Sequence, residues 1–145
     1  MLVDTSIWVA LMIDNHQFHA VARAWLAKVD QPGDAVVCRA SQQSLLRLLT
    51  TAAMYAPYGN RPMTNTQAWS AYHDLFADGR IAFVEEPPGI EVHWERLASR
   101  RSASPKLWMD AYLAAFAIAG GYRFVTTDRG FTQHPGLDLV LLTER

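Results

Sequence analysis

Residues 107–131, with the sequence LWMDAYLAAFAIAGGYRFVTTDRGF, decide how this chain folds. The first part is rich in Ala, Leu and Met, and its apolar residues recur at a 3.6-residue period up to Ile118, which predicts a helix. The pair Gly120-Gly121 can supply the positive φ that ends a helix. The apolar residues at 122–125 then predict a short buried strand, which ends in the polar run at 126–128.

A helix that feeds a parallel strand runs antiparallel to it, and this geometry brings two distant carboxylates to one level. The helix climbs about 16 Å after Asp110, and the strand returns about 20 Å to Asp128. Both residues are therefore expected at the carboxyl edge of the sheet, where open α/β sheets bind ligands. The start of the chain repeats the pattern, because a short strand at 1–3 is followed at once by Asp4.

Three carboxylates in one partly desolvated cleft would repel one another, which raises some of their pKa values or recruits a cation. Oxygen ligands alone favour Mg²⁺ or Mn²⁺ over zinc. Each Asp could instead be only a helix N-cap, a role that Asp often takes. Since three such caps would seldom share one edge by chance, the sequence predicts a metal site formed by Asp4, Asp110 and Asp128.

The composition indicates a single packed domain over residues 1–145, because half of the residues are hydrophobic and only 19% are charged. A net charge of −1 gives no global electrostatic argument for nucleic-acid binding. Cys38 is the only cysteine, which excludes a disulfide framework and a cysteine zinc site. No apolar run is long enough for a membrane span, and the strand at the start leaves no room for a signal peptide. We therefore expect a cytoplasmic protein.

Helices and short strands alternate along the rest of the chain, which predicts a three-layer α/β/α sandwich with a mainly parallel five-stranded sheet. Thr64 and Gln67 have the spacing of a capping box at the start of one helix. Besides the elements in 107–131 and the strand at 1–3, helices are expected over 7–12, 19–29, 42–54, 65–77 and 90–98, and strands over 35–38, 80–84 and 138–142.

Some polar and aromatic residues outside the aspartates have two possible roles. Ser41 is expected to cap the helix 42–54, which would place Gln42 in its first turn and point it toward the same sheet edge. Tyr58, in the loop 55–63, could stack on a base but is explained as well by covering the core. His16 and its neighbour three residues on could suggest a metal pair, but no Cys or further His lies near them in the sequence.

Three motifs together resemble the PIN domain: LVDTS at 2–6, WxDAYLAA at 108–115 and VTTDRGF at 125–131. More narrowly, they resemble the VapC-type toxins of bacterial toxin–antitoxin pairs, and the resemblance covers essentially the whole chain. It implies a Mg²⁺- or Mn²⁺-dependent endoribonuclease that forms a homodimer. It also implies a cognate VapB-type antitoxin whose C-terminal segment reaches into the acidic cleft and blocks cleavage.

The resemblance assigns the family's first, third and fourth acidic positions to Asp4, Asp110 and Asp128. The second position, usually Glu, is Gln42 in this chain, which keeps a carbonyl oxygen but lacks the charge. We expect the three aspartates to suffice, with Asp4 and Asp110 as direct ligands and Asp128 as a ligand or as the group that positions water. The alternative is a catalytically impaired PIN fold that still binds RNA or protein.

Basic side chains near the predicted site are candidates for contacts with RNA phosphates. A basic loop at 100–106 leads into the helix that carries Asp110, and a phosphate backbone bound there would need positive charge. The candidates are Lys106, Arg129 and Arg39.

A phospho-accepting receiver or a phosphatase is a further alternative for acidic residues at strand ends. A receiver needs an acceptor Asp after a middle strand and a Lys after the last one, but here Glu85 and Glu86 end the third strand and no Lys follows the last. A phosphatase of this type needs a second Asp two residues after the first, and position 6 is Ser. These missing parts argue against both classes.

Overall fold

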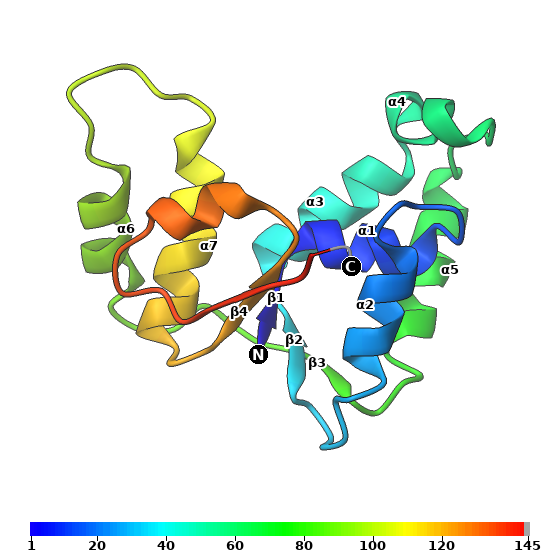
Figure 1. The fold of residues 1–145 in the computed structure, drawn as a ribbon, viewed down its shortest axis with the longest axis horizontal. Helices are drawn as coiled ribbons and strands as arrows, with labels where there is room; N and C mark the ends of the chain where they lie inside the picture. The colour runs from blue at the N-terminus through cyan, green and yellow to red at the C-terminus, as the bar shows by residue number, and fades with distance from the viewer. Residues whose placement is uncertain (144–145) are drawn as a thin grey trace.

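The computed structural model, which describes residues 1–143, has a parallel five-stranded sheet at its centre (Figure 1). The strand order is β3-β2-β1-β4-β5, and each neighbouring pair is parallel. The predicted sheet is thus confirmed, with strands of only two or three residues. Their bounds are β1 Leu2–Val3, β2 Ala35–Val37, β3 Ile81–Phe83, β4 Phe124–Thr126 and β5 Leu139–Leu141.

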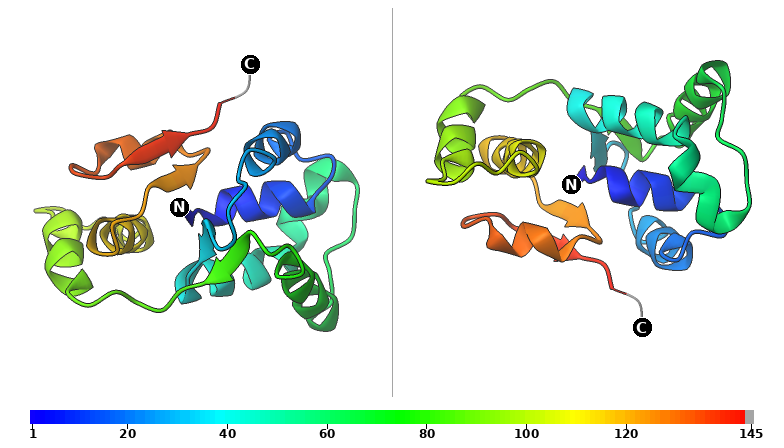
Figure 2. Two further views of the ribbon diagram at one scale, coloured as in Figure 1. Left: turned by 90° about the horizontal axis from the view of Figure 1, so that it is seen from below. Right: turned by 90° about the horizontal axis from the view of Figure 1, so that it is seen from above.

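The sheet is covered by helices on both faces, so the predicted three-layer sandwich is confirmed. Figure 2 shows α6 and α7 on one side and α1, α2, α3 and α5 on the other. No helix described in residues 1–143 is both long and apolar enough to cross a membrane. The helices are α1 Thr5–Met12, α2 His19–Leu26, α3 Arg39–Leu49, α4 Ala52–Tyr55, α5 Asn65–Leu75, α6 Ile90–Ala98 and α7 Leu107–Ala119, with short 3₁₀ turns η1 Ala56–Tyr58 and η2 Arg129–Gln133.

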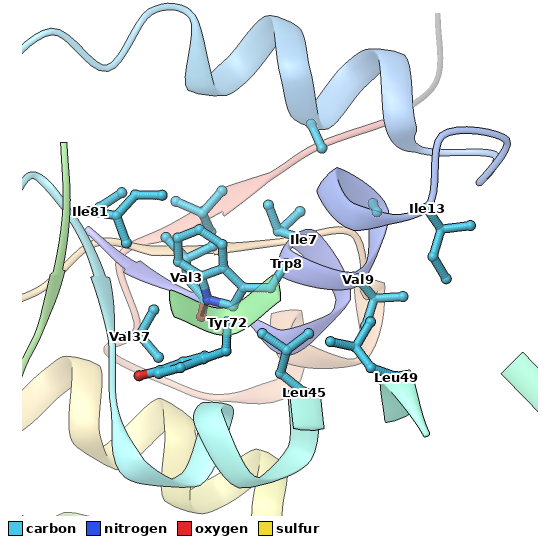
Figure 3. Close-up of a cluster of buried hydrophobic side chains, with 14 of the residues drawn as sticks. Val3, Ile7, Trp8, Val9, Ile13, Val37, Leu45, Leu49, Tyr72 and Ile81 are labelled. Atoms are coloured by element: carbon cyan, nitrogen blue, oxygen red, sulfur yellow. Dashed lines mark hydrogen bonds between the residues drawn. The ribbon is translucent and has the colours of Figure 1, made fainter. Parts of the chain in front are cut away.

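Successive strand residues point to opposite faces of the sheet and so divide the core into two clusters. In β1, Val3 packs with α1, α3 and α5, whereas Leu2 packs with α6 and α7. Figure 3 shows the first cluster, in which the fully buried Trp8 lies at the centre. Its indole Nε1 donates to the carbonyl of Val3 at 3.1 Å, which fixes α1 directly on the end of the first strand.

The structure corrects the expected start of α3. This helix begins at Arg39 after an N-cap at Cys38, so the prediction that Ser41 is the cap is wrong. Ser41 instead occupies the third position of the helix, where its Oγ accepts from the Cys38 amide at 3.1 Å, the reciprocal half of a capping box. Gln42 therefore lies in the first turn, as expected.

The expected helix 42–54 is broken near its middle. Threonine hydroxyls compete for the last carbonyls of α3, because Thr51 Oγ1 donates to the Arg47 carbonyl at 2.6 Å and Thr50 Oγ1 to the Leu46 carbonyl at 3.1 Å. The chain turns at these residues and resumes as α4, which runs on into η1. The region 55–63, expected to be a loop, thus begins with helical turns.

α7 ends at the glycine pair, as predicted, but the strand that follows it begins later than expected. Gly121 has φ of +66°, and the amide of Tyr122 donates to the Ala117 carbonyl at 2.8 Å, as in a Schellman motif. Because this motif uses Tyr122, β4 starts at Phe124 and not at 122. The capping box of Thr64 and Gln67 at α5 is confirmed.

Candidate active site: an acidic cleft at the carboxyl edge of the sheet

Asp4, Asp110 and Asp128 line one cleft of about 330 Å³ at the carboxyl edge of β1 and β4. The predicted convergence of these three side chains is therefore found in the structure. A larger cavity of about 510 Å³ lies between α1, α2 and α5, and none of the three aspartates lines it. Among its charged residues, Asp78 and Arg80 are paired with each other. The other residues that line the acidic cleft are Ser6, Val9, His16, Gln17, Phe18, Leu48, Met54, Thr127 and Phe131.

Asp4 is held by two hydroxyl groups at the bottom of the cleft. It is only 7% exposed, and its Oδ2 accepts from Ser6 Oγ at 2.7 Å and from Thr126 Oγ1 at 2.6 Å. Thr126 Oγ1 in turn accepts from the amide of Asp128 at 2.9 Å. Both hydroxyls donate to the same oxygen, Oδ2, and so fix the orientation of the carboxylate.

The electrostatics of the cleft agree with the expected crowding of negative charge. Burial raises the pKa of Asp4 despite the opposing hydrogen bonds from Thr126 and Ser6, and the charge of Asp128 adds a smaller increase. Burial also raises the pKa of Asp110, with smaller contributions from Asp128 and Asp4. A cation in the cleft would relieve this repulsion, because it favours the ionised form of each carboxylate.

Simple helix capping does not explain the three aspartates. Asp4 precedes α1 in the N-cap position, but its carboxylate makes no capping hydrogen bond. Asp110 lies inside the first turn of α7, after the N-cap residue. Asp128 does cap η2, since its Oδ1 accepts from the Gly130 amide at 2.7 Å. Two of the three carboxylates are thus available for another role.

Gln42 is not among the residues that line the cleft, although it lies in the first turn of α3 as predicted. Its side chain is 7% exposed, and its Oε1 accepts from Nη1 of Arg39. The guanidinium of Arg39 lies over the ring of Phe83, 4.6 Å from its centre. Burial raises the pKa of the nearby Tyr72, and the charge of Arg39 and a hydrogen bond with Gln42 lower it by a smaller amount. The Gln42 amide is therefore held toward α5 and β3.

The predicted phosphate contacts do not reach the bottom of the cleft either. Within residues 1–143, no Lys or Arg lines it. Lys106 is exposed just before α7, and Arg129 is exposed in η2 beside Asp128. Arg39 is occupied by Gln42 and Phe83. These three remain predictions for contacts at the rim.

Sequence reasoning missed two parts of the site. Ser6 and Thr126 each lie two residues from a predicted aspartate, so this spacing could have indicated the hydroxyl contacts. The wall formed by His16, Gln17 and Phe18 had no comparable signal, because the turn between α1 and α2 reaches the cleft only through the tertiary fold.

The cleft fits a divalent cation that keeps part of its water. Among residues 1–143, no three His, Cys, Asp or Glu side chains lie close enough to hold one ion directly. The structure therefore does not support Asp128 as a third direct ligand and leaves it the predicted alternative role of positioning water. The cleft still suits Mg²⁺, which keeps several waters and is bound through one or two carboxylates. The shared cleft and the raised pKa values of Asp4 and Asp110 carry this assignment.

Comparisons with known proteins agree with this architecture. The family model of the PIN domain matches residues 1–137, so the chain belongs to the PIN-domain family. Within that family it is similar to ribonuclease VapC41 of Mycobacterium tuberculosis strain H37Rv, with 50% identity over 145 residues that cover 99% of each chain. The resemblance to VapC-type toxins is thereby confirmed.

Solved structures share the fold at much lower identity. The crystal structure of Mycobacterium tuberculosis VapC20, a sarcin-ricin loop cleaving toxin, has a TM-score of 0.62 at 20% identity and covers 94% of this chain and 96% of that one. VapBC2 from Rickettsia felis, bound to a DNA fragment from their promoter, has a TM-score of 0.65 at 16% identity and covers 98% of both chains.

Proposed function

We propose that this protein is a divalent-metal-dependent endoribonuclease toxin that hydrolyses RNA phosphodiester bonds at Asp4, Asp110 and Asp128. The observation that carries the proposal is the meeting of these three carboxylates in one cleft, two of them with raised pKa values. The 50% identity to a ribonuclease over the full chain supports RNA as the substrate. Fold alone would not, since related folds host different functions.

Asp4 and Asp110 are the proposed direct ligands of Mg²⁺ or Mn²⁺. Asp128 is the proposed group that orients the attacking water, because no three acidic side chains of residues 1–143 lie close enough to hold one ion directly. Such an ion lowers the pKa of a bound water and stabilises charge on the scissile phosphate. The hydroxyls of Ser6 and Thr126 donate to Asp4 Oδ2 and so hold the carboxylate in a fixed orientation. The backbone amide of Asp128 donates to the same Thr126 hydroxyl, so one side chain fixes the positions of Asp4 and Asp128 relative to each other.

The proposed partners are an RNA substrate, a VapB-type antitoxin and a second copy of this chain as a homodimer, and the proposed location is the cytoplasm. The similar structures of VapBC2 and of VapC20 support the antitoxin and the RNA, respectively. Lys106 and Arg129, exposed beside the segments that carry Asp110 and Asp128, are the proposed phosphate contacts, with Arg39 as a third.

An RNA cleavage assay on antitoxin-free protein tests this function. Cleavage is expected with Mg²⁺ or Mn²⁺, and EDTA should abolish it. Calorimetric titration of the metal provides a second readout, with binding expected for the wild type and weakened for Asp110→Asn. Metal-independent cleavage, or no metal binding by the folded protein, would contradict the proposal.

An impaired PIN fold that only binds RNA or protein is the second candidate. It is favoured by one observation, the uncharged Gln42 that Arg39 holds away from the cleft. Cleavage that first appears in Gln42→Glu, with none in the wild type under any metal, would support this candidate.

A further inference from the structure

The wall of the cleft that faces the aspartates is built from the turn between α1 and α2. His16, Gln17 and Phe18 line the same cleft as Asp4, Asp110 and Asp128, and Tyr58 of η1 lies behind His16. We propose that His16 is a substrate-positioning residue that stacks on, and donates a hydrogen bond to, an unpaired RNA base beside the scissile phosphate. This inference rests on the proposed function and adds the subsite that would hold the base.

The contacts of His16 fix both its ring and its tautomer. Nδ1 accepts from the amide of Phe18 at 3.2 Å, so in the neutral ring the proton is on Nε2, which is then a donor. The ring lies 5.8 Å from that of Tyr58 and 6.1 Å from that of Phe18, measured between ring centres. The imidazole is therefore held, half-buried, among aromatic neighbours in the lining of the cleft.

A metal role for this residue is not supported. His19, the other member of the suspected pair, uses Nδ1 to donate to the carbonyl of Ala10 at 2.8 Å. His16 uses its own Nδ1 within the turn. Each histidine thus uses one ring nitrogen to hold the backbone between α1 and α2, and the other nitrogen of His19 lies 4.0 Å from Asp14 Oδ1.

An RNA base suits this wall better than a phosphate does. The cleft has carboxylates on one side and no Lys or Arg within residues 1–143, so a phosphate can bind only through a cation. The base attached to that nucleotide needs a flat surface and polar groups, and sequence-tolerant binding of unpaired bases uses aromatic stacking. His16 supplies the ring and the donor, and the exposed amide of Gln17 can contact the base edge. A volume of about 330 Å³ lies within the range of small-ligand sites.

His16→Asn isolates this contribution without opening the turn. The Asn Oδ1 can replace Nδ1 as the acceptor for Phe18, while the ring and the Nε2 donor are lost. We expect the affinity for a fluorescent single-stranded RNA, measured with Ca²⁺ in place of Mg²⁺ or Mn²⁺, to fall about 5- to 20-fold, in the lower part of the range for loss of one stacked base. In cleavage assays KM should rise by a similar factor, with kcat changed by less than about twofold. His16→Phe should restore part of the affinity by stacking.

His73→Asn is the matched control, because this histidine is exposed on α5 outside the cleft. It should leave RNA affinity unchanged. Unchanged affinity and KM in folded His16→Asn would overturn the inference, as would a variant weakened only in binding a VapB-type peptide, which would assign the wall to the antitoxin. Failure of the wild type to cleave with Mg²⁺ or Mn²⁺ would instead overturn the proposed function, and the binding measurement would still test His16.

Discussion

The two halves of the carboxyl edge of the sheet have opposite chemistry. The half at β1 and β4 gathers Asp4, Asp110 and Asp128, and two of these have raised pKa values. The half at β2 and β3 holds Gln42 and Arg39, with the guanidinium packed on an aromatic ring. In the first half, burial and to a smaller extent the neighbouring charges disfavour the ionised form of two carboxylates, which a bound cation would favour. In the second half, Gln42 already accepts a hydrogen bond from Arg39.

This difference is compatible with an amide at position 42, where the resemblance to the PIN domain implied an acid. An amide oxygen can accept from Arg39 without bringing a fourth negative charge to the edge. Under the proposed function, RNA cleavage depends on the β1–β4 half alone, so the two halves should respond differently to the same chemical change.

The largest effect is expected from removing one charge in the acidic half. Asp110→Asn, and likewise Asp4→Asn, should lower metal-dependent RNA cleavage by at least about 100-fold, as loss of one electrostatic contact to the reacting group does elsewhere. The rate of cleavage of a labelled RNA under saturating Mg²⁺ measures this. Asp138→Asn is the control, because Asp138 is exposed, pairs with Arg123 at 3.4 Å and precedes β5 at the other edge. If Asp110→Asn and Asp138→Asn cleaved RNA at similar rates, cleavage would not depend on the acidic half of the edge.

Thr126→Val tests how strongly the acidic half depends on its hydroxyl support. Thr126 is fully buried, and its hydroxyl both donates to Asp4 and accepts from the Asp128 amide. Replacing it by a methyl group leaves the part-buried Asp128 amide without its acceptor and the buried Asp4 carboxylate without one of its donors, which should cost about 1–3 kcal/mol of unfolding free energy. Cleavage should fall by about tenfold, the rate equivalent of 1.4 kcal/mol.

Urea unfolding and cleavage assays measure the two effects of Thr126→Val. Ser6→Ala removes the other donor to Asp4, but Ser6 is less buried, so its effect should be the smaller one. A loss of stability without any loss of cleavage would mean that Thr126 supports the fold and not the position of Asp4.

Gln42→Glu tests the satisfied half. The introduced carboxylate would lie beside the guanidinium of Arg39. We therefore expect a double-mutant cycle with Arg39→Gln to give a coupling of about 0.5–1 kcal/mol in unfolding free energy. The cleavage rate should change by less than about fivefold, the equivalent of 1 kcal/mol. A gain of 100-fold or more would show that the acidic half is incomplete without a fourth acid, and so would favour the impaired PIN fold.

The positions of the aspartates could be predicted because they depend on chain path. The lengths of the helix that ends at Gly121 and of the short apolar strand after it place Asp110 and Asp128 at the same edge of the sheet. This placement does not depend on contacts between neighbouring side chains. The alternation of helices and strands was likewise enough to predict a parallel sheet with helices on both faces.

Details that depend on competing side-chain contacts could not be predicted in the same way. The break after α3 results from Thr50 and Thr51 competing for backbone carbonyls, and a periodic apolar pattern does not register that competition. The direction of the Gln42 side chain depends on Arg39, which the sequence suggested only as a phosphate contact. The His16 wall needed the packing of the turn against η1, which is a long-range contact.

The smallest predicted effect concerns the pH dependence of stability, and it also belongs to the acidic half. His134 packs against Phe131, which lines the cleft, and both of its ring nitrogens are buried without a hydrogen-bond partner in residues 1–143. Burial, with help from the charge of Arg100, lowers the pKa of His134 below its ordinary 6.5. The folded state therefore binds this proton less readily than the unfolded state does. Stability is full above about pH 6.5 and is lost as the pH falls through the folded pKa.

His134→Phe should remove this part of the pH dependence, because the ring is kept and the titratable nitrogens are not. Between pH 7.5 and 5.5 the wild type should lose about 0.5–1 kcal/mol more unfolding free energy than the variant. Urea titrations at several pH values give the difference, and His73→Phe, at an exposed position on α5, should keep the wild-type slope. The pKa of His16 is also lowered by burial, so a residual slope is expected in His134→Phe. Equal slopes in the wild type and His134→Phe would mean that the buried ring does not contribute, and that the pH sensitivity of this half arises at the cleft itself.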